Sequence, residues 1–202
     1  MTARAEKAAG LMTFDAPYRA MGAVAGMDEA GRGPLAGNVV TACVVMPPEP
    51  LILWVDDSKK LSETRRESVF EEIMATAIWV GIGEADPEEI DRVNILEATR
   101  NAMRRAAAGA PADIFLIDAV KDLGLTGREV PLIKGDAQSY SIAAASIVAK
   151  VTRDRQMREM DRLYPAYGFS RHKGYGTKEH IEALRALGPC PIHRRSFIGH
   201  FV

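Results

Sequence analysis

Two adjacent carboxylates stand at the most chemically suggestive point of the sequence. Asp28 and Glu29 follow the apolar run AVAGM and are separated by one alanine from the glycine-rich segment GRGPLAG. Asp118 ends the apolar run IFLI, and Asp136 precedes a long helical pattern. Taken singly, an acid at the end of a strand or the start of a helix is more often a cap or a solvated terminus.

Four acids in such positions indicate metal chemistry. Clustered carboxylates raise one another's pKa unless a cation neutralises them. Oxygen ligands without nearby His or Cys favour Mg²⁺ or Mn²⁺ over Zn²⁺. We therefore predict that Asp28, Glu29, Asp118 and Asp136 are catalytic and bind a divalent metal. Neighbouring side chains on a flat strand point to opposite faces. If the strand ends at Glu29 and the chain bends there, both side chains, or one side chain and a backbone carbonyl, can face the same cleft.

The segment GRGPLAG places flexible backbone and a cation beside these acids. A plain hairpin connection is at least as common a role for such a glycine loop. The segment matches neither GxxxxGK[ST] nor the strand–GxGxxG–helix context of a dinucleotide site. Its position favours substrate binding, in which the backbone at Gly31 and Gly33 approaches a sugar or phosphate and Arg32 contributes charge.

The helical pattern over 138–164 carries a polar stripe at 100° per residue, made of Ser139, Ser146, Lys150 and Arg153. A solvated face is the common explanation of such a stripe. Because Asp136 immediately precedes this helix, we favour contact with a phosphodiester backbone.

Two turn-rich basic segments supply further candidates. DDSKKLSE contains Lys59 and Lys60, and SRHKGYGTKEH contains Lys173 and Tyr175. A tyrosine between two glycines can stack on a sugar or base, although packing against the core is the usual role of an isolated tyrosine.

The elements that position these residues follow an α/β pattern. After AVAGMDEA, strands are expected over 38–46, 77–85, 113–120 and 128–136, and helices over 62–77, 138–164 and 177–188. We predict a mixed β-sheet flanked by α-helices in residues 23–202. Residues 1–22 show no convincing period and are expected to form a loosely held arm.

Composition narrows the class of protein. The 202 residues are 47% hydrophobic with a formal net charge of −1, which fits one domain whose nucleic-acid surface, if any, is local. Cys43 and Cys190 lack paired spacing and are expected to be reduced thiols. The sequence shows no signal peptide and no apolar run of membrane-spanning length, so we expect a cytoplasmic protein.

Five segments, in order, resemble ribonuclease HII: DEAGRGPLAG, DSKKLSE, LIDAV, KGDAQSYSIAAASIVAKVTRD and HKGYGT. The resemblance runs from about residue 24 to RRSF near residue 197. It implies a ribonuclease H-like fold with a small C-terminal helical segment. It also implies an endonuclease that hydrolyses the RNA strand of RNA/DNA hybrids. Such an enzyme cuts 5′ to ribonucleotides embedded in duplex DNA, leaving 3′-hydroxyl and 5′-phosphate ends.

The resemblance assigns roles to the candidates above. The four acids correspond to the family's metal-binding quartet, which uses two Mg²⁺ or Mn²⁺ ions. Gly31, Arg32, Gly33 and Tyr175 would sense the 2′-hydroxyl and the sugar. The remaining substrate contacts would be Lys59, Lys60, Ser139, Ser146, Lys150, Arg153 and Lys173. The implied partners are RNA/DNA hybrid and ribonucleotide-containing duplex DNA. No membrane or obligate protein partner is implied, and the enzyme would be a monomer.

Two departures and two rival functions accompany this prediction. Asn38 replaces the family's usual proline, and no extended C-terminal tail for substrate or clamp binding is visible after RRSF. A metal-dependent nuclease of the same fold that cuts DNA junctions would use similar acids, but it would have no use for the GRG loop and Tyr175. A non-catalytic binding module of this fold would be expected to have lost at least one of the four acids.

Overall fold

The computed structural model describes residues 2–56 and 58–202. Its strands are β1 (Val24–Ala30), β2 (Val39–Val45), β3 (Trp79–Ala85), β4 (Ile114–Asp118) and β5 (Arg128–Leu132). Its α-helices are α1 (Ala3–Arg19), α2 (Glu63–Thr76), α3 (Pro87–Val93), α4 (Ile95–Ala107), α5 (Tyr140–Leu163), α6 (Phe169–His172), α7 (Lys178–Leu187) and α8 (Arg195–Ile198). Short 3₁₀ turns are η1 (Ser58–Lys60), η2 (Gly135–Ala137) and η3 (Pro165–Tyr167).

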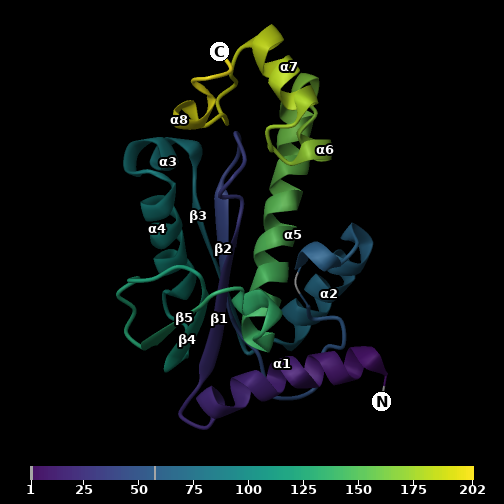
Figure 1. Cartoon of the computed structure of the whole chain (residues 1–202), viewed down its shortest axis with the longest axis vertical. Helices are drawn as coiled ribbons and strands as arrows, with labels where there is room; N and C mark the ends of the chain where they lie inside the picture. Colours follow the sequence, from purple (N-terminus) through teal and green to yellow (C-terminus); the bar gives the residue numbers. More distant parts are fainter. Residues whose placement is uncertain (1, 57) are drawn as a thin grey trace.

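The five strands form one mixed sheet in the order β3-β2-β1-β4-β5 (Figure 1). β1 is antiparallel to β2 and parallel to β4, and β5 continues the parallel part. This arrangement confirms the predicted fold class. It also sets β1 in the middle of the sheet, so the acids on β1 lie at the centre of the fold.

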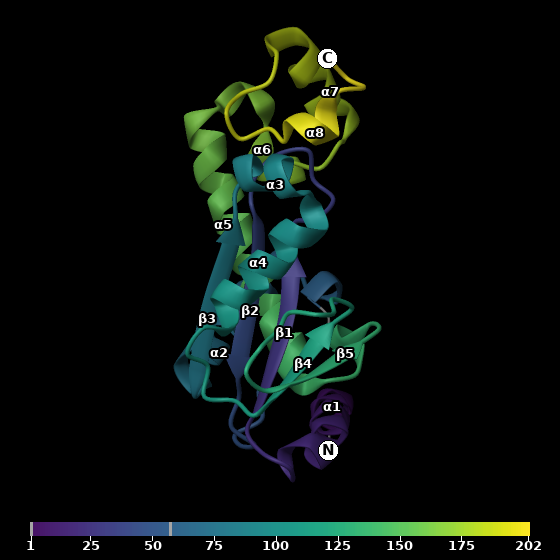
Figure 2. The same ribbon diagram turned by 90° about the vertical axis from the view of Figure 1, so that its left-hand side faces the viewer.

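Helices cover both faces of the sheet (Figures 1 and 2). Along β2, Ala42 and Val44 pack with α2 and α5, whereas Cys43 and Val45 pack on the other face, where Met103 of α4 lies. Burial on both faces explains why the central strands carry apolar residues in succession instead of only at alternate positions.

Two glycines let the main helices approach the sheet closely. A Cβ built on Gly26 of β1 would lie 2.0 Å from the backbone carbonyl carbon of Ser141. On the opposite face, a Cβ on Gly83 of β3 would lie 1.9 Å from the carbonyl oxygen of Ala102. The backbone of α5 therefore rests directly on β1, which fixes the side chains of α5 relative to Asp28.

The N-terminal residues are not the loosely held arm that we expected. α1 packs against the rest of the chain, and the Asp15 carboxylate, fully buried, accepts hydrogen bonds from the Ser141 backbone N–H (2.9 Å) and hydroxyl (2.7 Å). Arg19 donates to the carbonyl oxygen of Met46. Ala8, Leu11 and Asp15 form the buried face of α1, and a carboxylate at the third of these positions weakens the apolar period of the sequence.

The last part of the chain forms the expected C-terminal helical segment, which packs beside the far end of α5 (Figure 1). It has its own small core, in which Met157 of α5 contacts Tyr167 and Phe169. Cys43 and Cys190 are buried free thiols, as predicted. Among the described residues, the search for a helix with the length and hydropathy of a membrane span finds none.

Candidate active site

The register between β1 and β4 brings Asp28 and Asp118 together. β1 and β4 are parallel neighbours that pair Met27 with Ile117, so Asp28 and Asp118 are the next residues at the same end. Asp136 follows β5 on η2, and the Asp118 Oδ1 accepts a hydrogen bond of 2.7 Å from the N–H of Gly135. The candidate site thus forms at the carboxyl end of the parallel strands, where open α/β sheets commonly bind ligands.

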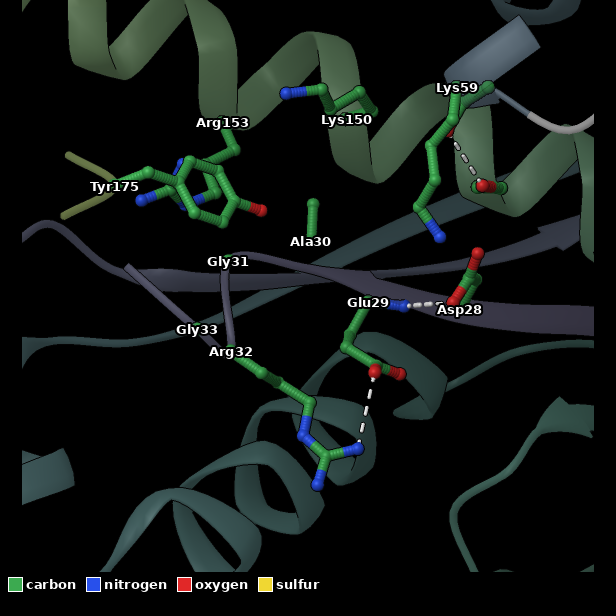
Figure 3. Close-up of a pocket in the computed structure, with 12 residues that line it drawn as sticks. Asp28, Glu29, Ala30, Gly31, Arg32, Gly33, Lys59, Lys150, Arg153 and Tyr175 are labelled. Atoms are coloured by element: carbon green, nitrogen blue, oxygen red, sulfur yellow. Dashed lines mark hydrogen bonds and ion pairs between the residues drawn. The ribbon is translucent and has the colours of Figure 1, made fainter. Parts of the chain in front are cut away.

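The prediction that β1 ends at Glu29 is wrong, because the strand continues through Ala30 and pairs Glu29 with Thr41. The strand alternation is therefore retained. Asp28 lies on the α5 side, and Glu29 points away from it on the other side (Figure 3). Both carboxylates nevertheless line one cavity, because it lies at the end of the sheet, where the two faces meet.

Burial sets the electrostatics of this pair. It raises the pKa of Asp28 well above its usual value, and the nearby charges of Glu29 and Asp118 raise it further. Burial likewise raises the pKa of Glu29 to about 7, with Arg32 acting in the opposite direction. Among the described residues, Glu29 Oε2 is a buried oxygen without a hydrogen-bond partner. These carboxylates are poorly neutralised by the protein itself.

A cavity of about 330 Å³ brings together most of the predicted site. Its lining comprises Asp28, Glu29, Ala30, Gly31, Arg32, Gly33, Ser58, Lys59, Ser146, Lys150, Arg153 and Tyr175. The residues come from β1, the following loop, η1, α5 and the loop before α7 (Figure 3). Segments far apart in sequence therefore converge on the acid pair.

A second cavity of about 490 Å³ contains the other two acids. Asp118 and Asp136 line it together with Lys59, Lys60 and Lys134. Lys59 lines both cavities, so its side chain lies between the two acid pairs. Three lysines beside four acids give this edge of the sheet groups for both metal and phosphate.

The two glycines of the GRG loop differ in their surroundings. Gly31 is buried at a φ of +97°, and a Cβ there would lie 2.0 Å from Arg153 Nε. Gly33 is exposed, and a Cβ there would meet only the Tyr175 ring, at an ordinary contact distance of 3.7 Å. Gly31 is thus required by the fold, whereas the open space at Gly33 is available to a ligand.

Tyr175 is 45% exposed, so its ring faces the cavity and does not join the core. Its loop is held from behind by histidines. His180 Nδ1 lies 2.9 Å from the carbonyl oxygen of Tyr175, and the N–H of Gly174 donates to His172 Nδ1. The ring is therefore free to contact a ligand while its backbone is fixed.

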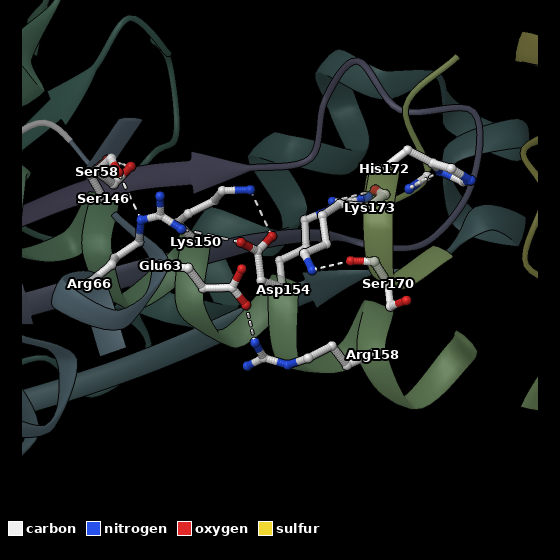
Figure 4. A network of polar contacts seen from close by, with 12 residues as sticks. Ser58, Glu63, Arg66, Ser146, Lys150, Asp154, Arg158, Ser170, His172 and Lys173 are labelled. Atoms are coloured by element: carbon white, nitrogen blue, oxygen red, sulfur yellow. Dashed lines mark hydrogen bonds and ion pairs between the residues drawn. The ribbon is translucent and has the colours of Figure 1, made fainter. Parts of the chain in front are cut away.

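A polar network holds η1 against α5 (Figure 4). Asp154 accepts hydrogen bonds from Lys150 at 2.7 Å and from Arg66 at 3.4 Å. Arg66 also donates to the carbonyl oxygen of Ser58, whose hydroxyl lies 3.0 Å from that of Ser146. Lys150 and Ser146 line the cavity, and the network fixes the turn that carries Lys59.

Three predicted substrate contacts have other surroundings. Ser139 is fully buried, caps α5 by accepting from the N–H of Ile142, and lies in neither cavity. Lys173 also lies outside both cavities, and its ammonium donates to the carbonyl oxygen of Ser170. Arg153 lines the first cavity but is only 1% exposed, since its guanidinium binds backbone carbonyls. The sequence stripe did not distinguish capping and internal anchoring from solvent exposure.

Sequence reasoning missed three residues. Lys134 immediately precedes Gly135 and Asp136 in the KGD run, so its proximity to an acid was a usable signal. Ser58 belongs to the basic segment DDSKKLSE but was not selected. Arg194 donates hydrogen bonds to the backbone carbonyls of Gly31 and Arg32 in the GRG loop, and nothing in the sequence around Arg194 indicates this contact.

Comparison with known proteins identifies the family to which the chain belongs. The family described as Ribonuclease HII matches residues 25–200. The ribonuclease HII of Acetivibrio thermocellus is 55% identical over 181 residues, which cover 89% of this chain and 71% of that protein. The chain belongs to the ribonuclease HII family. The Geobacter sulfurreducens ribonuclease HII is 53% identical over 178 residues, covering 87% and 82% of the two chains.

Solved structures show the same fold. Ribonuclease H2 from Pyrococcus horikoshii OT3 superposes with a TM-score of 0.73 at 28% identity, covering 86% of this chain and 92% of that one. Ribonuclease HII from Archaeoglobus fulgidus, solved in a complex with PCNA, gives 0.74 at 28% identity over 86% and 94% of the chains. The ribonuclease H-like fold and the assignment as a hydrolytic endonuclease of the ribonuclease H type are thus confirmed.

Proposed function

We propose that this ribonuclease HII cuts duplex DNA on the 5′ side of an embedded ribonucleotide, as well as the RNA strand of RNA/DNA hybrids. The proposed products carry 3′-hydroxyl and 5′-phosphate ends, and the enzyme acts as a monomer. One observation carries the proposal: the buried carboxylates share a cavity with the open backbone at Gly33 and the exposed ring of Tyr175.

The acids fit a divalent metal such as Mn²⁺ or Mg²⁺. Their donors are all oxygens, the pKa of Asp28 and of Glu29 is raised by burial, and Glu29 Oε2 lacks a partner among the described residues. A bound cation would offset the free-energy cost of ionising these buried carboxylates. Within the described chain, no three Asp, Glu, His or Cys side chains converge into a ready metal site. The proposal therefore includes a turn of the acid side chains towards the cations, which Asp28, Glu29, Asp118 and Asp136 would hold.

The chemistry that two such ions supply is activation of an attacking water and stabilisation of the leaving 3′-oxygen. The protein's own part is binding and orientation. Lys59 and Lys150, which line the first cavity, would bind phosphates of the substrate, and Lys59 also lines the cavity that contains Asp118 and Asp136. No side chain is required to act as a nucleophile.

Recognition of the ribonucleotide is assigned to the loop and the tyrosine. The absence of a Cβ at Gly33 lets the sugar approach the backbone, whose N–H groups can bind a 2′-hydroxyl. The Tyr175 ring would stack on the sugar at the RNA–DNA junction. A nuclease with no need to distinguish ribose from deoxyribose would gain nothing from this arrangement.

The test is cleavage of a labelled duplex that contains one ribonucleotide, beside an all-DNA duplex and a long RNA/DNA hybrid. Each substrate is incubated with Mg²⁺, Mn²⁺ or EDTA. We expect a metal-dependent cut 5′ to the ribonucleotide, with the all-DNA duplex intact. Equal cutting of the all-DNA duplex would refute recognition of the ribose. Cutting in EDTA would refute the metal mechanism, and binding without cutting would favour a binding module.

A further inference from the structure

Two buried arginines lie behind the GRG loop. Arg194 is fully buried and Arg153 is 1% exposed, which is unusual for guanidinium groups. Both guanidinium groups donate hydrogen bonds only to backbone carbonyl oxygens. Burial lowers the pKa of Arg194, and the charge of Arg153 lowers it further. Holding two cations here is costly, so a gain elsewhere must account for them.

Arg194 uses all five of its N–H donors on the loop. Nε and Nη2 bind the carbonyl of Gly37 at 2.9 and 2.7 Å, and Nη2 also binds that of Gly31 at 2.6 Å. Nη1 binds the carbonyls of Arg32 and Pro34 at 3.0 and 2.9 Å. A guanidinium offers five donors in a fixed plane, whereas an ammonium offers three from one point. The four carbonyls are therefore drawn to one side of the loop.

This fixes the opposite side of the loop as well. In a trans peptide the C=O and the N–H point in opposite directions. With the carbonyls of Gly31 and Arg32 turned to Arg194, the N–H groups of Arg32 and Gly33 point away from it. Among the described residues, neither of these two N–H groups forms a hydrogen bond within the protein. Both residues line the cavity beside Asp28 and Glu29.

Arg153 joins the same loop to the segment that carries Tyr175. It binds the carbonyls of Asn38 at 3.0 Å, Ala36 at 3.1 Å and Lys173 at 3.0 Å. The N–H of Leu35 donates to the carbonyl of Gly174 at 2.8 Å, which makes a second link. The GRG loop and the segment that carries Tyr175 are thus fixed relative to each other by contacts on the side away from the cavity.

We propose that Arg194 is a positioning residue for substrate recognition, which turns the N–H groups of Arg32 and Gly33 into the cavity so that they bind the ribose 2′-hydroxyl and the adjoining phosphate. Arg153 completes the arrangement by holding Tyr175 in register with these two N–H groups. The choice of ligand rests on the proposed function, whereas the orientation of the peptides does not.

The first test uses the free protein and therefore does not depend on the substrate. Amide hydrogen exchange, followed by NMR on the ¹⁵N-labelled protein, should show rapid exchange at Arg32 and Gly33. Slow exchange at both positions would overturn the proposal, since protected amides would be turned into the protein. This measurement on the wild-type chain stands even if a variant fails to fold.

The second test replaces the guanidinium. Arg194→Lys keeps the charge but cannot reach four carbonyls, and Arg194→Gln removes the charge. Arg195→Gln is the matched control, because Arg195 is the exposed neighbour. For the duplex with one ribonucleotide, we expect Arg194→Lys to lower kcat/KM at least tenfold with shifted Arg32 and Gly33 amide signals, and Arg195→Gln to leave both unchanged.

Rescue separates positioning from general loss of structure. Added guanidinium ion, far below denaturing concentration, should restore part of the activity of Arg194→Gln, whereas urea at the same concentration should not. Equal effects of the two additives, or lost activity with unchanged amide signals, would overturn the proposal. If the wild-type enzyme fails to cut at the ribonucleotide, the proposed function is refuted. Amide exchange still tests the orientation of the Arg32 and Gly33 N–H groups in that case.

Discussion

The sharpest prediction compares two alanine substitutions in one short loop, Gly31→Ala and Gly33→Ala. In sequence the two glycines are equivalent members of GRG. In the structure the first is buried beneath Arg153, and the second is open to the cavity. We expect Gly31→Ala to damage folding and Gly33→Ala to damage substrate binding alone.

The size of each effect follows from the surroundings. At Gly31 the added Cβ would lie 2.0 Å from Arg153 Nε and 2.8 Å from the Asn38 carbonyl oxygen, at a φ of +97°. Left-handed strain costs about 1–2 kcal/mol. Displacing Arg153 from its carbonyls adds about 1–3 kcal/mol. The sum of about 2–5 kcal/mol lowers Tm by about 4–20 °C for a chain of this length.

At Gly33 the fold imposes no such cost. The nearest atom to the added Cβ is Tyr175 Cε1 at 3.7 Å, and φ lies outside the left-handed region. Stability should stay within about 1 kcal/mol of wild type, with a small gain expected from the stiffer unfolded chain. The methyl group would instead occupy space needed by the sugar. An overlap costing about 1–3 kcal/mol lowers kcat/KM by about 5- to 150-fold.

The assay is thermal unfolding by circular dichroism together with steady-state cleavage of the duplex with one ribonucleotide. Gly124→Ala is the control, since Gly124 has a φ of +69° but no atom within 4 Å of its built Cβ. It reports the cost of the left-handed conformation without a clash. Wild-type activity in Gly33→Ala would refute close approach of the substrate, and an unchanged Tm in Gly31→Ala would refute the packing of Arg153 on the loop.

Three further predictions concern single side chains. Asp28→Asn should abolish cleavage yet raise the Tm of the metal-free protein at neutral pH. Burial raises the pKa of Asp28, so the stability that its carboxyl group contributes is fully present below the unfolded pKa and is lost as pH rises through the raised pKa of the folded state. Asp122→Asn, at an exposed position, should leave Tm unchanged, and a lower Tm in Asp28→Asn would contradict the reasoning. Tyr175→Phe should keep most of kcat/KM, and Tyr175→Ala should lose it, whereas equal losses would assign the role to the hydroxyl. His193 has a pKa lowered to about 4, chiefly by burial and by His180, so stability is fully present above about 6.5 and is lost as pH falls towards 4. Urea unfolding between these pH values should show that the free energy of unfolding falls by about 2 kcal/mol in the wild type and by less in His193→Gln. An equal fall in both proteins would show that His193 does not cause the pH dependence.

The sequence alone predicted most of the strands and helices after residue 22, and it singled out the four acids as candidates. Apolar runs, caps and glycine stops located the central strands and the long helices, and Ser62 caps α2 as its position indicated. Local side-chain pattern determines such features, because secondary structure depends on periodicity and on the satisfaction of terminal N–H groups. The resemblance in five segments named the family that the comparisons confirm.

Only the tertiary structure decided which polar residues face the site. Ser139 and Arg153 share a helical stripe with Lys150, yet the first caps a helix and the second binds buried carbonyls. Likewise, α1 looked unstructured because its docking depends on Asp15 and a serine 126 residues away in sequence. Arg194 reaches a loop more than 150 residues earlier in the chain. Such partners cannot be predicted from the neighbouring residues in the sequence, because the hydrogen bonds that stabilise a buried polar group come from segments that only the folded chain brings together.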